Sequence, residues 1–442
     1  MVELLKSELI CDNLTVNQRG HLCLAGWDTV DLAKKYGTPL YLYDEGHIRA
    51  RARLYQQAAK EAFGKNTRVL YASKAACFKA LLEVMKEENM GIDVVSSGEI
   101  ATAIAAGFPL ERAYFHSNNK TDEDVRFAIE NGIGAFVVDN AEELYAIERE
   151  AAKQGITQKV LLRLTPGIDP HTYAAVATGQ VDSKFGSAIE TGQAEEITRL
   201  AISPAFPHIH LAGFHCHVGS QVFEADVFLK AVDIMLAFIA HIQSECGYEI
   251  EELDLGGGYG VRYTEADPAL SIAENIKEVG KCAKERARAL GITLPTILLE
   301  PGRSMVADAG MTLYTVGTVK RITGYKNYVS VDGGMTDNPR YALYRSAYTL
   351  LPADNMKAER EMRASVVGRC CESGDILQEN VPLPDSISRG NILACLTTGA
   401  YNYSMAMNYN RIPRPAVVFL TEKDTRLVVK RETLSDLLRL DT

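Results

Sequence analysis

Short apolar runs alternate with amphipathic stretches between about residue 46 and residue 302, and this alternation most constrains the fold. The runs are rich in Val, Ile and Leu, as expected of buried parallel strands. Eight strands are predicted, at Arg68–Lys74, Gly91–Ser97, Ala113–Ser117, Ala135–Asp139, Val160–Pro166, Leu211–Gly219, Glu252–Gly258 and Thr296–Gly302. Eight strand–helix units predict an α/β fold, a closed (β/α)8 TIM barrel. An open doubly wound sheet is the alternative, and the strand count disfavours it.

The stretches between the strands carry helix-end signals. Thr121, with Asp124 three residues later, predicts the start of a helix that continues over Val125–Asn131. Asn140–Gly155 and Ser271–Gly291 are similar, and each closes on a glycine that suits the left-handed conformation after a helix.

The helical spacing fades after Gly302. Further strands are predicted at Thr312–Arg321, Tyr328–Val331, Ala364–Gly368, Ile392–Leu396, Ala416–Leu420 and Arg426–Val429, with short strands before residue 45. We therefore predict a barrel at residues 46–305. The C-terminal part, 306–442, is expected to form an all-β domain, sandwich-like or barrel-like, that also takes in the N-terminal strands of residues 1–45.

Charge and cysteine content exclude several classes of protein. The net charge of −10 and the lack of a basic run argue against a nucleic-acid partner. Met1 to Cys11 mix charged with apolar residues, so neither a signal peptide nor a membrane span is expected. Nine cysteines without a CxxC pair indicate thiols rather than disulfides or a zinc site. A cytoplasmic protein is expected.

The first predicted barrel strand delivers one lysine, Lys74, at its end. Burial there would lower the pKa of the lysine and leave a neutral amine that can form a Schiff base with an aldehyde. The alternative is that Lys74 simply ends the strand and reaches solvent. Chemistry in such barrels collects at the carboxyl ends of the strands, so the other strand ends decide between these interpretations.

The ends of the seventh and eighth strands indicate a phosphate site. Gly256, Gly257 and Gly258 follow strand seven, and their amides can approach an anion closely. A flexible loop is the alternative, but Arg303 follows strand eight, at the usual phosphate position of these barrels.

Two histidines and one glutamate complete the predicted site. His215 and His217 alternate along strand six, as expected of a metal pair or of a ring that stacks on a planar cofactor. No third metal ligand follows at matching spacing, so no metal is expected, and a structural role for His215 stays open. Glu300 precedes Pro301 and needs a cation, either Arg163 or Arg303 or the ring nitrogen of a pyridinium. Together these groups indicate pyridoxal 5′-phosphate.

Seven motifs in order resemble the barrel-type, alanine-racemase-like (fold type III) pyridoxal-phosphate decarboxylases over nearly the whole chain. They are Tyr71-Ala72-Ser73-Lys74-Ala75, His215 to Gln221, Asp254 to Gly260, Glu300-Pro301-Gly302-Arg303, Asp332-Gly333-Gly334-Met335 running to Arg340 and Leu343-Tyr344, Cys371-Glu372-Ser373-Gly374-Asp375, and Gly399-Ala400-Tyr401 before Ser404-Met405-Ala406.

The resemblance implies a role for each matched residue. Catalytic groups would be the cofactor lysine Lys74, the stacking His217, the ring-nitrogen partner Glu300 and the proton donor Cys371. The cofactor would be bound by Lys74, Asp93, Arg163, His217, Ser220, Gly257, Gly258, Glu300, Gly302, Arg303 and Tyr401. The substrate would be bound by Arg303, Arg340, Tyr344, Glu372 and Tyr401. Cys371 and Glu372 would serve the partner subunit of a two-fold homodimer.

The pairing of Glu372 with Arg340 favours a substrate whose distal end bears both an ammonium and a carboxylate. The expected reaction is decarboxylation of meso-2,6-diaminopimelate to L-lysine and CO2, the last step of lysine biosynthesis by the diaminopimelate route. A decarboxylase of ornithine, lysine or arginine, a racemase on the same fold, and a non-catalytic pyridoxal-phosphate-binding homologue are the alternatives.

Overall fold

The computed structural model describes residues 9–65, 67–168 and 182–442. The chain divides into two compact units. The barrel unit comprises Arg51–Gly260 and Leu270–Ser304, and the sheet unit comprises Met1–Ala50, Val261–Ala269 and Met305–Thr442.

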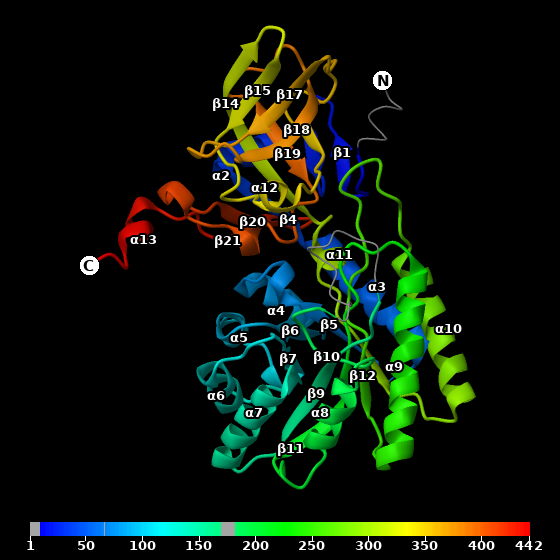
Figure 1. Cartoon of the computed structure of the whole chain (residues 1–442). Coiled ribbons are helices and arrows are strands. Elements are labelled where there is room, and N and C mark those ends of the chain that lie inside the picture. Colours follow the sequence, from blue (N-terminus) through cyan, green and yellow to red (C-terminus); the bar gives the residue numbers. More distant parts are fainter. Residues whose placement is uncertain (1–8, 66, 169–181) are drawn as a thin grey trace. The chain divides into compact units, whose positions relative to one another are not determined.

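The barrel unit is built on eight parallel strands within its described residues (Figure 1). In chain order they are β5 (Arg68–Ala72), β6 (Gly91–Val94), β7 (Ala113–Phe115), β8 (Ala135–Val138), β9 (Gln158–Thr165), β11 (Ile209–His215), β12 (Glu252–Asp254) and β13 (Thr296–Leu299), with the short β10 (Ser187–Ala188) beside β9. Pairing of β8 with β9 closes the ring, which confirms the predicted TIM barrel. Inward side chains including Leu70, Tyr114 and Leu161 fill its interior.

A helix follows each barrel strand, as predicted. Helix α3 (Glu45–Phe63) precedes β5, and the helices that follow the strands are α4 (Lys79–Glu87), α5 (Ser97–Ala105), α6 (Asp122–Glu130), α7 (Ala141–Gln154), α8 (Gln193–Ala201), α9 (Ala225–Cys246), α10 (Ile272–Leu290) and α11 (Arg303–Val306). Thr121 and Asp124 form the predicted capping box of α6. Gly155 and Gly291 end α7 and α10 in the left-handed conformation, with φ of 65° and 71°, also as predicted.

The predicted strands run past the observed ends. The prediction carried the seventh strand to Gly258, whereas β12 ends at Asp254. Gly256 has a φ of 67°, a left-handed conformation outside the extended region of regular strands. The chain therefore leaves the barrel two residues before the glycines and presents them as a loop.

The sheet unit is a mixed β-sheet domain. Its described strands are β1 (Leu14–Val16), β2 (Leu22–Leu24), β3 (Trp27–Asp28), β4 (Leu40–Asp44), β14 (Gly310–Ile322), β15 (Lys326–Val331), β16 (Leu350–Pro352), β17 (Met362–Val367), β18 (Ile376–Leu383), β19 (Ile392–Leu396), β20 (Ala416–Leu420) and β21 (Thr425–Val429). Its helices are α2 (Thr29–Tyr36), α12 (Arg340–Tyr344) and α13 (Leu434–Leu438).

N-terminal strand β4 lies between two C-terminal strands, antiparallel to β14 and parallel to β20. The expectation that the N-terminal strands join the C-terminal domain is therefore confirmed. Strands β16 and β18 were not predicted. Strand β18 is an edge strand of the large sheet. It carries polar residues at Gln378, Glu379 and Asn380, so its sequence lacks the clear apolar alternation that marks a strand. No helix in the described ranges is long and apolar enough to cross a membrane.

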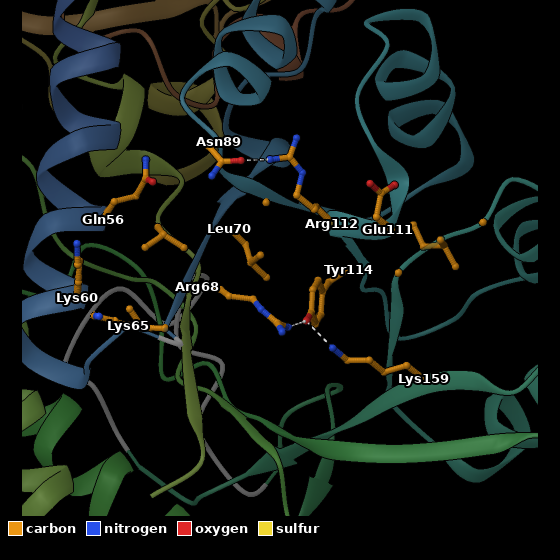
Figure 2. Close-up of a pocket in the computed structure, with 16 residues that line it drawn as sticks. Gln56, Lys60, Lys65, Arg68, Leu70, Asn89, Glu111, Arg112, Tyr114 and Lys159 are labelled. Atoms are coloured by element: carbon orange, nitrogen blue, oxygen red, sulfur yellow. Dashed lines mark hydrogen bonds between the residues drawn. The ribbon is translucent and has the colours of Figure 1, made fainter.

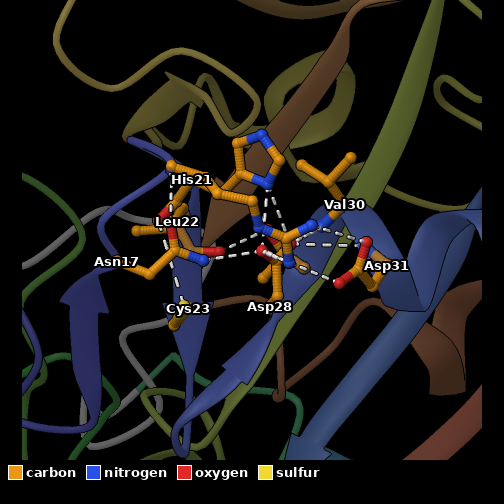
Figure 3. Close-up of polar contacts among 9 residues, drawn as sticks. Asn17, His21, Leu22, Cys23, Asp28, Val30 and Asp31 are labelled. Atoms are coloured by element: carbon orange, nitrogen blue, oxygen red, sulfur yellow. Dashed lines mark hydrogen bonds and ion pairs between the residues drawn. The ribbon is translucent and has the colours of Figure 1, made fainter.

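Helix α2 begins at a shared carboxylate, Asp28 (Figure 3). Asp28 Oδ1 accepts the backbone N–H groups of Val30 at 2.9 Å and Asp31 at 3.2 Å. Its Oδ2 accepts Asn17 Nδ2 at 2.6 Å and lies 2.9 Å from His21 Nδ1. Burial opposes ionisation here, but these hydrogen bonds outweigh it and hold the pKa of Asp28 below its usual value.

We predict that Asp28→Ala destabilises the sheet unit by about 1 kcal/mol, because α2 loses its N-cap. Asp31→Ala, at an exposed position in the first turn, is the control and should cost less. Because the folded pKa is lowered, the Asp28 contribution is present above the unfolded pKa and disappears as pH falls through the folded one. Thermal unfolding of both variants at neutral and acidic pH measures this; equal losses for the two variants would contradict it.

Candidate active site

Lys74 follows β5 inside a short 3-10 turn, Ser73–Ala75. The Tyr71 hydroxyl accepts from the Ala76 N–H at 3.1 Å and donates to the Ala76 carbonyl at 2.8 Å, which holds this turn. The turn directs the lysine off the strand, so its side chain is 42% exposed rather than buried. Its Nζ lies 3.6 Å from Oδ2 of the buried Asp93 on β6.

Glu99, in the first turn of α5, adds a second acid near Lys74. Its Oε2 accepts the Val95 N–H at 2.7 Å. Burial raises the pKa of Glu99 to about 7, with the charge of Asp93 adding to the shift and that of Lys74 opposing it. Glu99 was not among the predicted site residues, although Ser96 three residues earlier caps α5 and gives the local signal for an acid at this position.

Glu300 follows β13 and is held by two buried imidazoles. His215 Nε2 lies 3.1 Å from Glu300 Oε2, and His116 Nε2 lies 2.7 Å from Oε1. Burial alone would raise the pKa of Glu300, but the two imidazoles outweigh it and hold that pKa well below its usual value. Burial lowers the pKa of His215 to about 3, so this ring is a neutral donor. The partners shown are thus histidines, whereas the sequence analysis considered Arg163 and Arg303.

His116 was not among the predicted site residues. It directly follows β7, so the same strand-end argument that selected Lys74 would have found it. His116, His215 and Glu300 are also a group that could hold a metal ion, their ligand atoms lying within 4.8 Å of one another. His215 and Glu300 are hydrogen-bonded at 3.1 Å, whereas His116 Nε2 and Glu300 Oε1 lie 2.7 Å apart as a close polar contact without hydrogen-bond geometry.

Asp254, the last residue of β12, lies beside Glu300. Burial and the neighbouring Glu300 charge raise the pKa of Asp254 well above its usual range, whereas the pKa of Glu300 is held well below, so Glu300 is the carboxyl group of the pair that ionises first. Asp254 Oδ1 also accepts the Gly256 N–H at 2.8 Å. This residue therefore connects the buried carboxylate to the glycine loop.

The glycine loop packs too closely for side chains. A Cβ on Gly257 would overlap the Glu300 carbonyl oxygen, and one on Gly258, whose φ is 118°, would overlap the Gly219 carbonyl oxygen. Nearby, Arg303 donates from Nε and Nη2 to the Ser220 hydroxyl at 3.2 and 3.0 Å. Bare backbone beside a guanidinium and a hydroxyl is the cradle that a phosphate requires.

Three further predicted residues border these groups. His217 packs against Gly256, and burial lowers the pKa of His217 well below its usual value, so its ring is neutral. Arg163 is paired with His215 across β9 and β11, and its guanidinium lies 4.3 Å from the Phe185 ring centroid. Gly302 packs against Ala72, where an added Cβ would lie 2.9 Å from the Ala72 Cβ.

The sheet unit gathers the other predicted residues in two places. The Arg340 guanidinium carbon lies 5.4 Å from the Tyr344 ring centroid and 5.5 Å from that of Tyr401. Cys371 and Glu372 lie in the loop between β17 and β18, and both are exposed. The Cys371 N–H donates to Asn410 Oδ1 at 2.9 Å, and Glu372 Oε1 accepts the Gly374 N–H at 3.2 Å.

The barrel residues fit pyridoxal phosphate. The cradle suits its phosphate, the neutral His217 suits its ring face, the ionised Glu300 suits a protonated ring nitrogen, and the exposed Lys74 amine suits its aldehyde. Fold and site together define a barrel-type pyridoxal-phosphate enzyme.

Comparison with known proteins narrows this class. The pyridoxal binding domain of the pyridoxal-dependent decarboxylases matches residues 45–307. Diaminopimelate decarboxylase of Bacillus subtilis (strain 168) is 46% identical over 425 residues, covering 96% of each chain. The crystal structure of the M. jannaschii diaminopimelate decarboxylase with L-lysine has a TM-score of 0.90 at 33% identity, covering 98% of each chain. The crystal structure of the Helicobacter pylori diaminopimelate decarboxylase with L-lysine has a TM-score of 0.83 at 31% identity, and the match covers 94% of this chain and 99% of the H. pylori chain.

The chain belongs to the diaminopimelate decarboxylase family of fold type III pyridoxal-phosphate-dependent decarboxylases. The resemblance drawn from the seven motifs is confirmed, and so is the pyridoxal-phosphate cofactor.

We predict that Gly257→Ala weakens retention of pyridoxal phosphate by about tenfold, because relieving the overlap must displace the backbone at Glu300. Gly98→Ala is the control, since a Cβ at this helical position would lie 3.6 Å from its nearest neighbour, Ser96 Oγ. Cofactor absorbance after gel filtration, with titration of the stripped proteins, measures retention. Equal retention by the two variants would contradict the close-approach argument.

Proposed function

We propose that this chain decarboxylates meso-2,6-diaminopimelate at its D centre and yields L-lysine and CO2, the last step of lysine biosynthesis by the diaminopimelate route. The main observation in favour of this substrate is the environment of Arg340. Its side chain is buried, its Nη2 donates to the Ser346 hydroxyl at 3.3 Å, and its Nε has no hydrogen-bond partner among the described residues. A buried guanidinium among hydroxyls and tyrosine rings calls for an anion.

The distal carboxylate of diaminopimelate is such an anion, and ornithine, lysine and arginine lack it. We assign its binding to Arg340 and Tyr344 together with Arg303, and the distal ammonium to Glu372. The relatives support this choice, because the B. subtilis protein is a diaminopimelate decarboxylase and the M. jannaschii and H. pylori enzymes were crystallised with L-lysine, the expected product.

Pyridoxal phosphate, when bound, supplies a ring that accepts the electron pair left when the carbon–carboxylate bond breaks and CO2 leaves. We propose that Lys74 attaches the cofactor aldehyde and Asp93 orients the lysine. Glu300, kept ionised by His116 and His215, would hold a proton on the ring nitrogen, and His217 would cover the ring face.

The phosphate would be bound by residues from four segments. They are Ser220, Gly257, Gly258, Gly302, Arg303 and Tyr401. Arg163 would balance the negative charge of the buried acids, since Asp139, Glu300 and Asp93 all act on it electrostatically. Residues 46–305 are the proposed cofactor-binding domain.

Cys371 is the proposed proton donor to the carbon that loses CO2. Its thiol is exposed, whereas burial and Asp375 raise the pKa of the adjacent Cys370 to about 12. We propose that Cys371 and Glu372 serve the site of a partner subunit, which makes the active form a two-fold homodimer with two shared sites. All nine cysteines are free thiols, in keeping with a cytoplasmic location.

The alternatives fit these residues less well. A decarboxylase of smaller basic amino acids would leave Arg340 without an anion, and a racemase would need a base on the second face of the substrate. A non-catalytic pyridoxal-phosphate protein would have no use for Cys371, Glu372 and Arg340 together.

We predict that Arg340→Gln lowers kcat/KM for diaminopimelate by about a hundredfold, because truncating one partner of a buried charge pair costs 2–5 kcal/mol or more. The ratio of activity on lysine or ornithine to that on diaminopimelate should rise. Arg345→Gln, at the exposed end of the same helix, is the control and should stay near wild type. Release of CO2 from each amino acid is measured; faster release from ornithine than from diaminopimelate by the wild type would refute the substrate.

We predict that Lys74→Ala and Cys371→Ala are each inactive and that their equimolar co-assembly recovers about a quarter of wild-type activity, because half of the random dimers hold one intact shared site.

Lys74→Ala should lose the borohydride-fixed cofactor adduct seen by mass spectrometry, whereas Cys371→Ala should keep the yellow chromophore. Cys370→Ala is the matched thiol control and should remain active. Failure of co-assembly to restore turnover would show that sites are not shared, and an adduct persisting at another lysine would remove Lys74 from its role.

A further inference from the structure

A cavity of about 760 Å³ opens in the barrel unit at the end where the strands begin (Figure 2). Arg68 and Gly91, the first residues of β5 and β6, line it, as do Tyr114 near the start of β7 and Lys159 near the start of β9. Lys74 and Glu300 follow the opposite ends of their strands. The cavity is therefore distinct from the proposed cofactor site.

The charges that line this cavity are unbalanced. Five cationic side chains reach it, and Glu111 is the one carboxylate among its described lining residues; the cations are Lys60, Lys65, Arg68, Arg112 and Lys159. The whole chain has 57 acidic and 47 basic residues, so a representative sample of its surface would contain more acids than bases. Such a local excess of positive charge on an acidic protein attracts anions.

A hydrogen-bond network of side chains forms the floor of the cavity (Figure 2). Arg68 Nη1 and Lys159 Nζ donate to the Tyr114 hydroxyl at 2.9 and 2.8 Å. The same two groups donate to Oε1 of the buried Glu252, at 2.5 and 2.7 Å. One buried carboxylate thus serves two cations.

The remaining cations lie on two walls (Figure 2). Lys60 on α3 and Lys65 just after it lie on one side; both are exposed, and neither has an ion-pair partner among the described residues. Arg112 lies on the other side, where its Nη1 donates to Asn89 Oδ1 at 2.6 Å. Cations held apart on different walls favour a ligand that carries negative groups at more than one end.

We propose that this cavity binds a small, multiply charged anion that bears phosphate or carboxylate groups. Its volume is within the range of about 300–1,000 Å³ that is usual for small-molecule sites. Leu70 and Ile133 offer apolar contact to the body of the ligand, and Gln56 offers an amide beside the lysines.

The same strands carry this site and the catalytic groups. Strand β5 runs from Arg68 to the turn that holds Lys74, and β12 runs from Glu252 to Asp254 beside Glu300. An anion on the floor network therefore contacts strands whose other ends hold the cofactor-binding residues.

The test is calorimetric titration of the holoenzyme, whose phosphate cradle is already filled by pyridoxal phosphate, with pyrophosphate and separately with citrate at constant ionic strength. Saturable binding of one anion per chain is expected for at least one probe; pyrophosphate alone would identify a phosphate ligand, and citrate alone a carboxylate ligand. The double variant Lys60→Ala/Lys65→Ala should weaken that binding by about tenfold or more. These lysines are chosen because their loss leaves Glu252 paired with Arg68 and Lys159.

The matched control is Lys281→Ala/Lys284→Ala, which removes the same charge from exposed positions on α10, outside the cavity lining. This control should bind the probe like wild type. Absence of saturable binding of either anion to the wild type, unchanged affinity in the Lys60/Lys65 variant, or equal weakening in both double variants would overturn the proposal.

Discussion

The site depends on keeping one carboxylate ionised inside the barrel. Glu300 is buried, and the two histidines that face it, His116 and His215, stabilise its ionised form electrostatically, which outweighs the cost of burial. Burial and the Glu300 charge raise the pKa of Asp254 beside it well above its usual range, which disfavours two adjacent negative charges. Because Asp254 also accepts the Gly256 N–H, the acid pair and the glycine loop form one connected structure.

Much of the fold follows from local sequence. The barrel strands are continuous Val-, Ile- and Leu-rich runs, and helix ends such as Thr121 and Gly155 carry signals that act over four residues. Strand ends were less predictable, since β12 ends at Asp254, just before the left-handed backbone of Gly256, and no change in polarity marks that end. Strand β18 escaped prediction because its polar residues mask the alternation that would mark it.

The site was predictable where a strand end fixes a residue's place, as for Lys74 and Glu300. Contacts between side chains on different strands were not predictable, because they depend on where each strand stands around the closed ring of the barrel. His116 follows β7 and Glu300 follows β13, which are not neighbours in that ring, and their contact depends on how far each side chain reaches. The exposure of Lys74 likewise depends on a 3-10 turn, and the apolar sequence before it contains no signal that predicts this turn.

The position of β4 bears on how this polypeptide matures during synthesis. Leu42 pairs with Met311 on one side and with Val418 on the other, so a strand made among the first residues obtains its neighbours only when the last part of the chain emerges from the ribosome. Sheet partners so distant in sequence close slowly. The barrel segment is translated in full before then, so β4 must wait with both edges unpaired, a state in which chaperone binding or pairing with another nascent chain competes with native assembly.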